Sequence, residues 1–118
     1  MSTIAPFLQV ALGGAIGSVL RHLAVSAFGA PWAVIAINVS GSFAIGILLV
    51  PLSGRPGLSP LLMTGLLGGF TTFSAFSLDS LRLWEAGRPL AATLYAGGSV
   101  ALSLVAVTLG VAIARSLP

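Results

Sequence analysis

The sequence predicts an all-α membrane protein in which one domain, residues 1–118, crosses the bilayer four times. Composition is the first indication, because 57% of the residues are hydrophobic and only 6% are charged, far below the roughly one quarter found in soluble proteins. Spacing is the second, because glycine and proline divide the chain into four apolar stretches. Each stretch approaches the roughly 20 residues that a membrane-spanning helix needs.

The expected spans cover about residues 7–28, 32–50, 61–84 and 89–114. Pro6 opens the first span. Trp32 begins the second at a membrane interface, where aromatic anchors are common. Glycine and proline around Arg55 form the next loop, and Pro89 suits the first turn of the fourth helix.

The third span is expected to break at mid-membrane, near residues 68–74. Its stretch GGFTTFSAF sets glycines beside β-branched threonines, and both residue types weaken a helix. Non-helical backbone at membrane depth is tolerated only inside protein or beside a water-filled cavity. Broken helices in transport proteins bind ions. A packing kink would explain the glycines but not Phe73 and Phe76.

The arginines hardly favour one orientation in the membrane. With four spans, Arg55 and Arg115 lie on one side, and two or three arginines count for the other: Arg82, Arg88 and, if its side chain extends to the headgroups, Arg21. Because arginine and lysine bias across short loops sets orientation, we expect insertion in both orientations and an antiparallel homodimer. Closed two-fold dimers are the commonest oligomers. An accidentally weak topology signal is the alternative.

Composition also excludes several classes of function. The chain has no cysteine, so disulfides and cysteine-based metal or redox chemistry are excluded. The net charge of +3 rests on scattered arginines, whereas nucleic-acid binding needs a clustered basic patch. The N-terminus lacks the features of a cleaved secretory signal, so the first span is expected to stay. No catalytic arrangement can be assembled from His22 and the peripheral acids Asp79 and Glu85, so we expect no enzyme.

Polar residues in the spans favour an anion as the permeating species. Tyr95, Ser99 and Ser103 follow one another at intervals of four residues and so form a hydroxyl track on one helix face. Serine often bonds its own helix backbone, but three aligned hydroxyls are a stronger indication. The Asn38 amide must be satisfied in hydrocarbon, and an interhelical hydrogen bond would suffice; on its motif alone, packing is the preferred interpretation.

Aromatic and charged residues point the same way. Phe73 and Phe76 lie three residues apart just beyond the expected break, and their positive ring edges could favour an anion. The first 78 residues contain no aspartate or glutamate, although a cation path normally needs an intramembrane carboxylate. Arg21 either extends to the lipid headgroups or lines an aqueous vestibule that attracts anions.

The motifs GGAIGSVLRH, NVSGSFAIG, GGFTTFSAFS and the Tyr-Ser-Ser track, in this order across nearly the whole chain, resemble the Fluc family of small fluoride ion channels. The resemblance implies passive export of cytoplasmic fluoride across the plasma (inner) membrane, through an antiparallel dual-topology homodimer with two pathways. It implies a structural sodium ion held by the backbone carbonyls of Gly68 and Thr71 of each subunit. The fluoride pathway that it implies comprises Asn38, Phe73, Phe76, Tyr95, Ser99, Ser103 and Thr72, with Arg21 in the vestibule.

The sequence departs from the family pattern at three positions. Ala75 stands where the family usually has threonine, Ser18 where alanine is usual and His22 where tyrosine is common. None of these changes removes an expected pathway donor. His22, near the membrane interface, is expected to be a solvated or packing residue.

Two other functions remain open at this point. A small multidrug transporter has four helices and often dual topology, but its cationic substrates require a carboxylate in the first span, and this first span has none. A non-conducting membrane scaffold subunit would need only glycine-rich packing. It would leave the hydroxyl track and the aromatic pair without a role.

Overall fold

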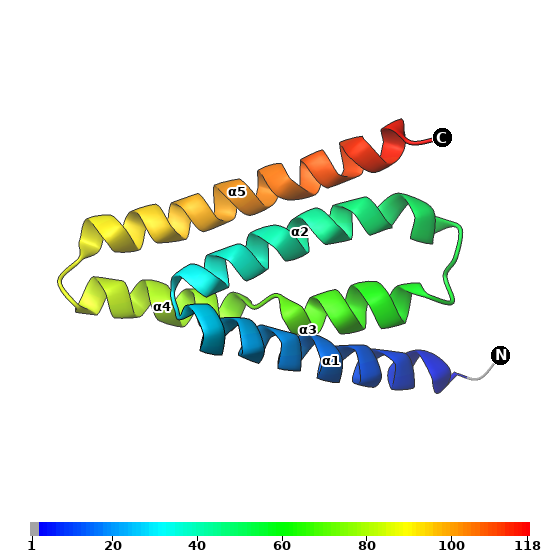
Figure 1. Ribbon diagram of the computed structural model, residues 1–118, viewed down its shortest axis with the longest axis horizontal. Helices are drawn as coiled ribbons and strands as arrows, with labels where there is room; N and C mark the ends of the chain where they lie inside the picture. The colour runs from blue at the N-terminus through cyan, green and yellow to red at the C-terminus, as the bar shows by residue number, and fades with distance from the viewer. Residues whose placement is uncertain (1–2) are drawn as a thin grey trace.

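The computed structural model describes residues 3–118, which form four long antiparallel helical spans (Figure 1). Three spans are continuous helices: α1 (Ala5–Phe28), α2 (Trp32–Ser53) and α5 (Pro89–Ser116). The third comprises η1 (Pro60–Leu67), α3 (Gly68–Phe70) and α4 (Phe73–Glu85). All four spans are long and apolar enough to cross a membrane. The prediction of an all-α protein with four spans is confirmed.

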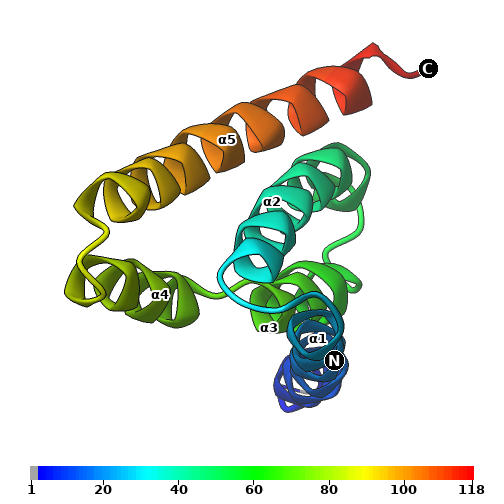
Figure 2. The ribbon, with the colours of Figure 1, turned by 60° about the vertical axis from the view of Figure 1, so that its left-hand side comes forward.

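The spans pack as two antiparallel pairs. α5 lies along α2, and α1 lies along η1 and α3, as Figures 1 and 2 show. Beyond the interruption, α4 leaves α1 and packs on α5 instead. The third span therefore connects the two pairs. The start of α1 and the end of α5 lie at the same end of the molecule (Figure 1).

Glycine allows the backbones within each pair to approach closely, as is common for membrane helices. A Cβ atom on Gly46 of α2 would lie 2.5 Å from the carbonyl oxygen of Val107 on α5. In the other pair, a Cβ atom on Gly17 of α1 would collide with the carbonyl of Leu66. Neither glycine could carry a side chain without separating two helix backbones.

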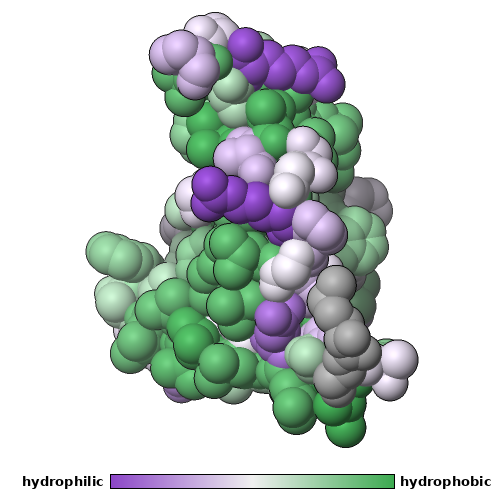
Figure 3. Space-filling model, turned by 90° about the vertical axis from the view of Figure 1, so that its right-hand side faces the viewer, coloured by the Kyte–Doolittle hydropathy of each residue, from purple (hydrophilic) through white to green (hydrophobic). Residues whose placement is uncertain are grey.

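The buried core is thin. Val34 and Ile37 of α2 are 2% and 3% exposed, but large apolar side chains are exposed along every span, including Phe7, Leu23, Leu94 and Leu104. Figure 3 shows mostly hydrophobic surface with separate hydrophilic groups at the end that carries both termini. Contiguous apolar surface of this kind marks contact with membrane or protein, which fits lipid or a second subunit.

The third span is interrupted at Thr71 and Thr72, within the stretch that the sequence indicated. The backbone is extended at both residues, with ψ angles of 155° and 118°. The helix resumes at Phe73, and the Thr72 hydroxyl accepts a hydrogen bond from the Ala75 N–H at 3.1 Å, as a threonine N-cap does. The π-helical geometry of η1, before the interruption, was not predicted from the sequence.

Candidate functional site

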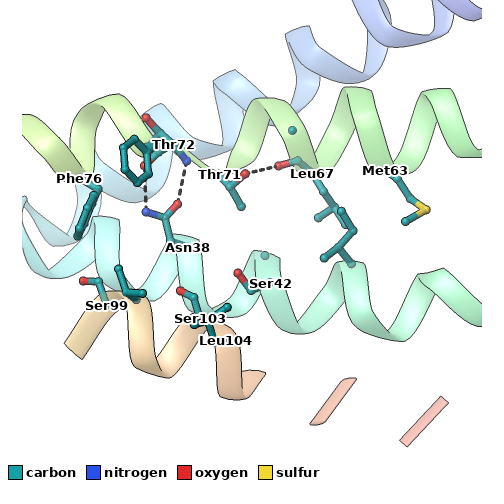
Figure 4. A pocket seen from close by; sticks show the side chains of 15 residues that line it. Asn38, Ser42, Met63, Leu67, Thr71, Thr72, Phe76, Ser99, Ser103 and Leu104 are labelled. Carbon is teal, nitrogen blue, oxygen red and sulfur yellow. Dashed lines mark hydrogen bonds between the residues drawn. The ribbon is translucent and has the colours of Figure 1, made fainter. Parts of the chain in front are cut away.

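A cavity of about 420 Å³ lies beside the interruption, between α2, the third span and α5. We name it the central cavity. It brings together residues that are far apart in sequence, and Figure 4 shows side chains reaching it from all three spans. The expected site residues that line it are Asn38, Gly68, Thr71, Thr72, Phe73, Phe76, Ser99 and Ser103. Tyr95 and Arg21 lie elsewhere.

Asn38 joins α2 to the interruption through both ends of its amide. Its Nδ2 donates to the Thr72 carbonyl at 3.0 Å, and its Oδ1 accepts from the Thr72 N–H at 2.8 Å (Figure 4). In a continuous helix that N–H would donate to the carbonyl four residues earlier, which belongs to Gly68. Asn38 therefore replaces a helical hydrogen bond and stabilises the extended backbone at Thr72.

The two threonines fix the backbone on either side of the interruption. The Thr71 hydroxyl donates to the Leu67 carbonyl at 2.9 Å and closes the preceding helix. The Thr72 hydroxyl caps α4 and lies 3.2 Å from the Ser74 hydroxyl. Because the backbone at Thr71 is extended, its carbonyl leaves the helical direction and is available to a ligand. Thr72 is only 8% exposed, so its hydroxyl stabilises the start of α4 in addition to lying beside the cavity.

Three aromatic rings form a row that begins in the wall of the central cavity, to which Phe73 and Phe76 belong. The ring centroids of Phe73 and Phe76 lie 5.3 Å apart with the planes tilted by 45°. Phe76 also stacks on Tyr95, with centroids 5.8 Å apart and 26° between the planes. Phe73 is 76% exposed, whereas Tyr95 is buried. The row thus runs from the surface of the subunit into its core.

The expected hydroxyl track is divided by this row. Ser99 and Ser103 line the central cavity, but Tyr95 packs against Phe76 and does not line it. The Ser99 side chain is buried, and its hydroxyl has no hydrogen-bond partner among the described residues. By contrast, Thr93 and Thr108 on the same helix each donate to the carbonyl four residues earlier, at 2.8 Å. A buried polar group without a partner is costly, and this one is free to bond a ligand in the cavity.

Arg21 lies in a second cavity of about 370 Å³, which we name the Arg21 cavity. Its polar lining consists of Ser18, Arg21, His22, Asp79 and Arg82. The cavity also reaches Ala30 in the turn between α1 and α2, so it lies at the membrane end opposite the two termini. This position fits the vestibule that the sequence analysis expected for Arg21.

Asp79 is the residue that sequence reasoning missed. It was treated as a peripheral acid, but it is 7% exposed and belongs to the lining of the Arg21 cavity. The available signal was spacing, because Ala75, Asp79 and Arg82 lie at i, i+4 and i+7 and therefore share one helix face. The three departures from the family pattern, Ser18, His22 and Ala75, line this cavity too.

The residues beside the interruption fit a cation held by carbonyl groups rather than by side chains. Among the described residues, no group of three histidine, aspartate or glutamate side chains could hold a metal ion. Sodium is a hard cation that is compatible with oxygen ligands. The Gly68 carbonyl lacks its helical donor, since the Thr72 N–H is bound to Asn38, and Gly68 is exposed on the surface of the subunit.

Comparisons with known proteins all indicate the same family. Residues 8–111 match the family described as CrcB-like protein, Camphor Resistance (CrcB). The chain is 48% identical over 119 residues to the fluoride-specific ion channel FluC of Paracoccus denitrificans, which covers 94% of this chain and 95% of that protein. It is 49% identical over 120 residues to the FluC of Chelativorans sp., with 93% and 96% covered. The FluC of Cereibacter sphaeroides is 47% identical over 119 residues, with 95% and 96% covered.

Proposed function

The chain belongs to the CrcB family, and on that premise we propose that it is a fluoride-specific ion channel of the FluC type and not an enzyme. It releases cytoplasmic fluoride passively across the inner membrane. Within the structure, the observation that best supports this function is the central cavity, which the unpaired Ser99 hydroxyl and the rings of Phe73 and Phe76 line together beside a broken helix. The multidrug-transporter alternative requires a carboxylate in the first span, which this chain lacks. The FluC proteins named above do not support it either.

Selectivity for fluoride follows from the chemistry of the cavity wall. A channel must replace the water around its ion with groups that are nearly as favourable. The hydroxyls of Ser99 and Ser103 can donate to an anion, and Phe73 and Phe76 can offer positive ring edges. Among residues 3–118, no carboxylate lines the central cavity, so none of these side chains repels an anion there by charge.

Asn38 contributes in two ways. One N–H of its amide and its carbonyl oxygen hold Thr72, and this keeps the helix interrupted. An asparagine amide carries two N–H donors, so the second remains for an anion in the cavity. Thr72 shares the first role through the cap of α4.

We also propose that two subunits pair antiparallel, with two fluoride pathways and one sodium ion between them. The near balance of arginines on the two sides and the exposed apolar surface support this assembly. The carbonyls of Gly68 and Thr71 from both subunits would hold the ion. A bound sodium ion would supply a fixed positive charge that ties the two interrupted helices together. In Na⁺ the purified protein should therefore melt at a higher temperature than in K⁺ of equal concentration, and equal melting temperatures would argue against this site.

Ion efflux from liposomes tests the proposed function. Vesicles that contain the purified protein are loaded with potassium fluoride or potassium chloride, and loss of the anion is followed with an ion-selective electrode after valinomycin is added. We expect rapid loss of fluoride and retention of chloride. If folded, dimeric protein releases neither anion, the channel function is wrong and the scaffold interpretation gains support. Equal release of both anions would contradict selectivity alone.

A further inference from the structure

The Arg21 cavity contains two cations and one buried anion. Arg21 is half-buried, and its Nε atom is buried without a hydrogen-bond partner among the described residues. Arg82 lies across the cavity with 68% of its side chain exposed. The Asp79 side chain is 8% exposed. With neutral histidine, the cavity has a net charge of +1, and without Asp79 the charge would be +2.

The Asp79 carboxylate is not part of a tight ion pair. The distance from its Oδ1 to the Nη1 of Arg82 is 4.0 Å, at the limit for a salt bridge. Its Oδ2 is buried and has no hydrogen-bond partner among the described residues. The Tyr95 hydroxyl lies next to Asp79, close enough for a charge interaction and a weak hydrogen-bonding contact with the carboxylate, although no hydrogen bond of standard geometry joins the two side chains. The ion pair with Arg82 is loose and a neutral hydroxyl does not cancel a charge, so the charge of Asp79 acts on the cavity that this residue lines.

Under the proposed function, the Arg21 cavity serves as the entrance of the anion pathway, and a buried carboxylate there needs an explanation. Two arginines alone would bind anions strongly, and divalent anions most strongly, because charge interactions in partly buried sites are only weakly screened. Anions held there would obstruct the entrance. A carboxylate among the arginines reduces that attraction and still leaves the cavity positive.

We propose that Asp79 sets the anion affinity of the Arg21 cavity, so that monovalent anions enter and leave quickly and divalent anions are not retained. Asp79 is thus a specificity-determining residue that acts through its charge. It offsets one arginine and does not itself bind the permeating ion. Arg21 and Arg82 supply the remaining attraction, which concentrates fluoride at the entrance.

Sulfate inhibition of fluoride efflux tests this proposal. Efflux is measured with increasing sodium sulfate, and ionic strength is kept constant with sodium gluconate. In the Asp79→Asn variant the half-inhibitory sulfate concentration should fall by about tenfold, because a divalent anion in the cavity then loses its repulsion from one nearby unit charge. Glu85→Gln is the matched control, since it removes the same charge from an exposed position on α4 outside this cavity. It should leave sulfate inhibition unchanged.

A second substitution separates charge from structure. Arg82→Gln in the Asp79→Asn background restores a net charge of +1, so the weak sulfate inhibition of the original protein should return. If inhibition stays strong in the double variant, or if Asp79→Asn alone does not increase it, the proposal is wrong. If Asp79→Asn does not fold, Arg82→Gln by itself tests the charge balance of the cavity. At low ionic strength this variant should release fluoride several-fold more slowly than the original protein. At high ionic strength, where exposed charges are screened, the two efflux rates should become similar. Unchanged efflux would overturn the proposal.

The inference rests on the proposed fluoride conduction, so sulfate binding is also measured without transport. A ligand that binds the folded state raises the melting temperature. Sulfate should therefore raise the melting temperature of purified Asp79→Asn protein more than that of the original protein or of Glu85→Gln. This difference is expected even if no fluoride passes, and its absence contradicts the role of Asp79 independently of channel function.

Discussion

Replacement of Asn38 by leucine is the sharpest test of how the interruption is held. Leucine has a similar size but removes both hydrogen bonds to Thr72, at 3.0 and 2.8 Å. Such bonds contribute about 0.6–1.5 kcal/mol each, and the buried Thr72 N–H that is left unpaired costs roughly 1–3 kcal/mol more. We take the lower part of the summed range because the central cavity beside Thr72, at about 420 Å³, is large enough for water to reach the unpaired N–H. The expected loss of folding free energy is therefore about 2–4 kcal/mol.

The loss of stability is measured by reversible unfolding in mixed detergent micelles, and fluoride efflux is measured in liposomes. Because the interrupted conformation loses its main support, we expect efflux to fall by at least about tenfold, which corresponds to about 1.4 kcal/mol. Ser40→Ala is the control, since the Ser40 hydroxyl bonds the Ile37 carbonyl of its own helix at 3.2 Å. Original stability and efflux in Asn38→Leu would refute the reasoning.

Three further outcomes are expected. Phe73→Ile together with Phe76→Ile should keep the proposed dimer on size exclusion but suppress fluoride efflux, and normal efflux would contradict the role of the ring edges. Gly46→Val should lower stability by about 1–3 kcal/mol or more, because its Cβ would lie 2.5 Å from a carbonyl oxygen of α5. Gly97→Ala should not lower stability, since nothing lies within 4 Å of the added Cβ. Equal melting temperatures of the two variants would refute this packing argument. Ser99→Ala should reduce fluoride efflux. It should leave stability unchanged or higher, since the hydroxyl that is lost has no hydrogen-bond partner among the described residues and an unpaired buried hydroxyl is costly. Unchanged efflux would exclude the hydroxyl from the pathway.

Much of the fold follows from the sequence because the bilayer restricts the alternatives. Apolar stretches between glycine and proline can hide their backbone groups only as helices, and this alone gives the four spans. The stretch from Gly68 to Thr72 also predicted the place of the interruption, because local helix propensity is low there. The π-helical turns of η1 lie against α1, and a local sequence pattern does not encode such packing between helices.

The candidate site was less predictable than the fold. Helical spacing put Ser99, Ser103 and Tyr95 on one face, but it could not show that Phe76 would cover Tyr95. The hydrogen-bond partner of Asn38 could not be predicted either, since the two bonds join residues 34 positions apart in the sequence. Asp79 looked peripheral because its burial depends on neighbouring helices, and those neighbours are visible only in three dimensions.

The bond between Asn38 and the Thr72 backbone gives the channel an internal reporter of its own dynamics. The Thr72 amide proton is held by a side chain from another helix, so hydrogen exchange at this amide requires α2 and the third span to separate, not merely a helix to fray. Its exchange rate therefore measures the free energy of opening this one contact. A change in that rate on addition of fluoride would reveal coupling between the ion and the interruption, even when the average structure does not move.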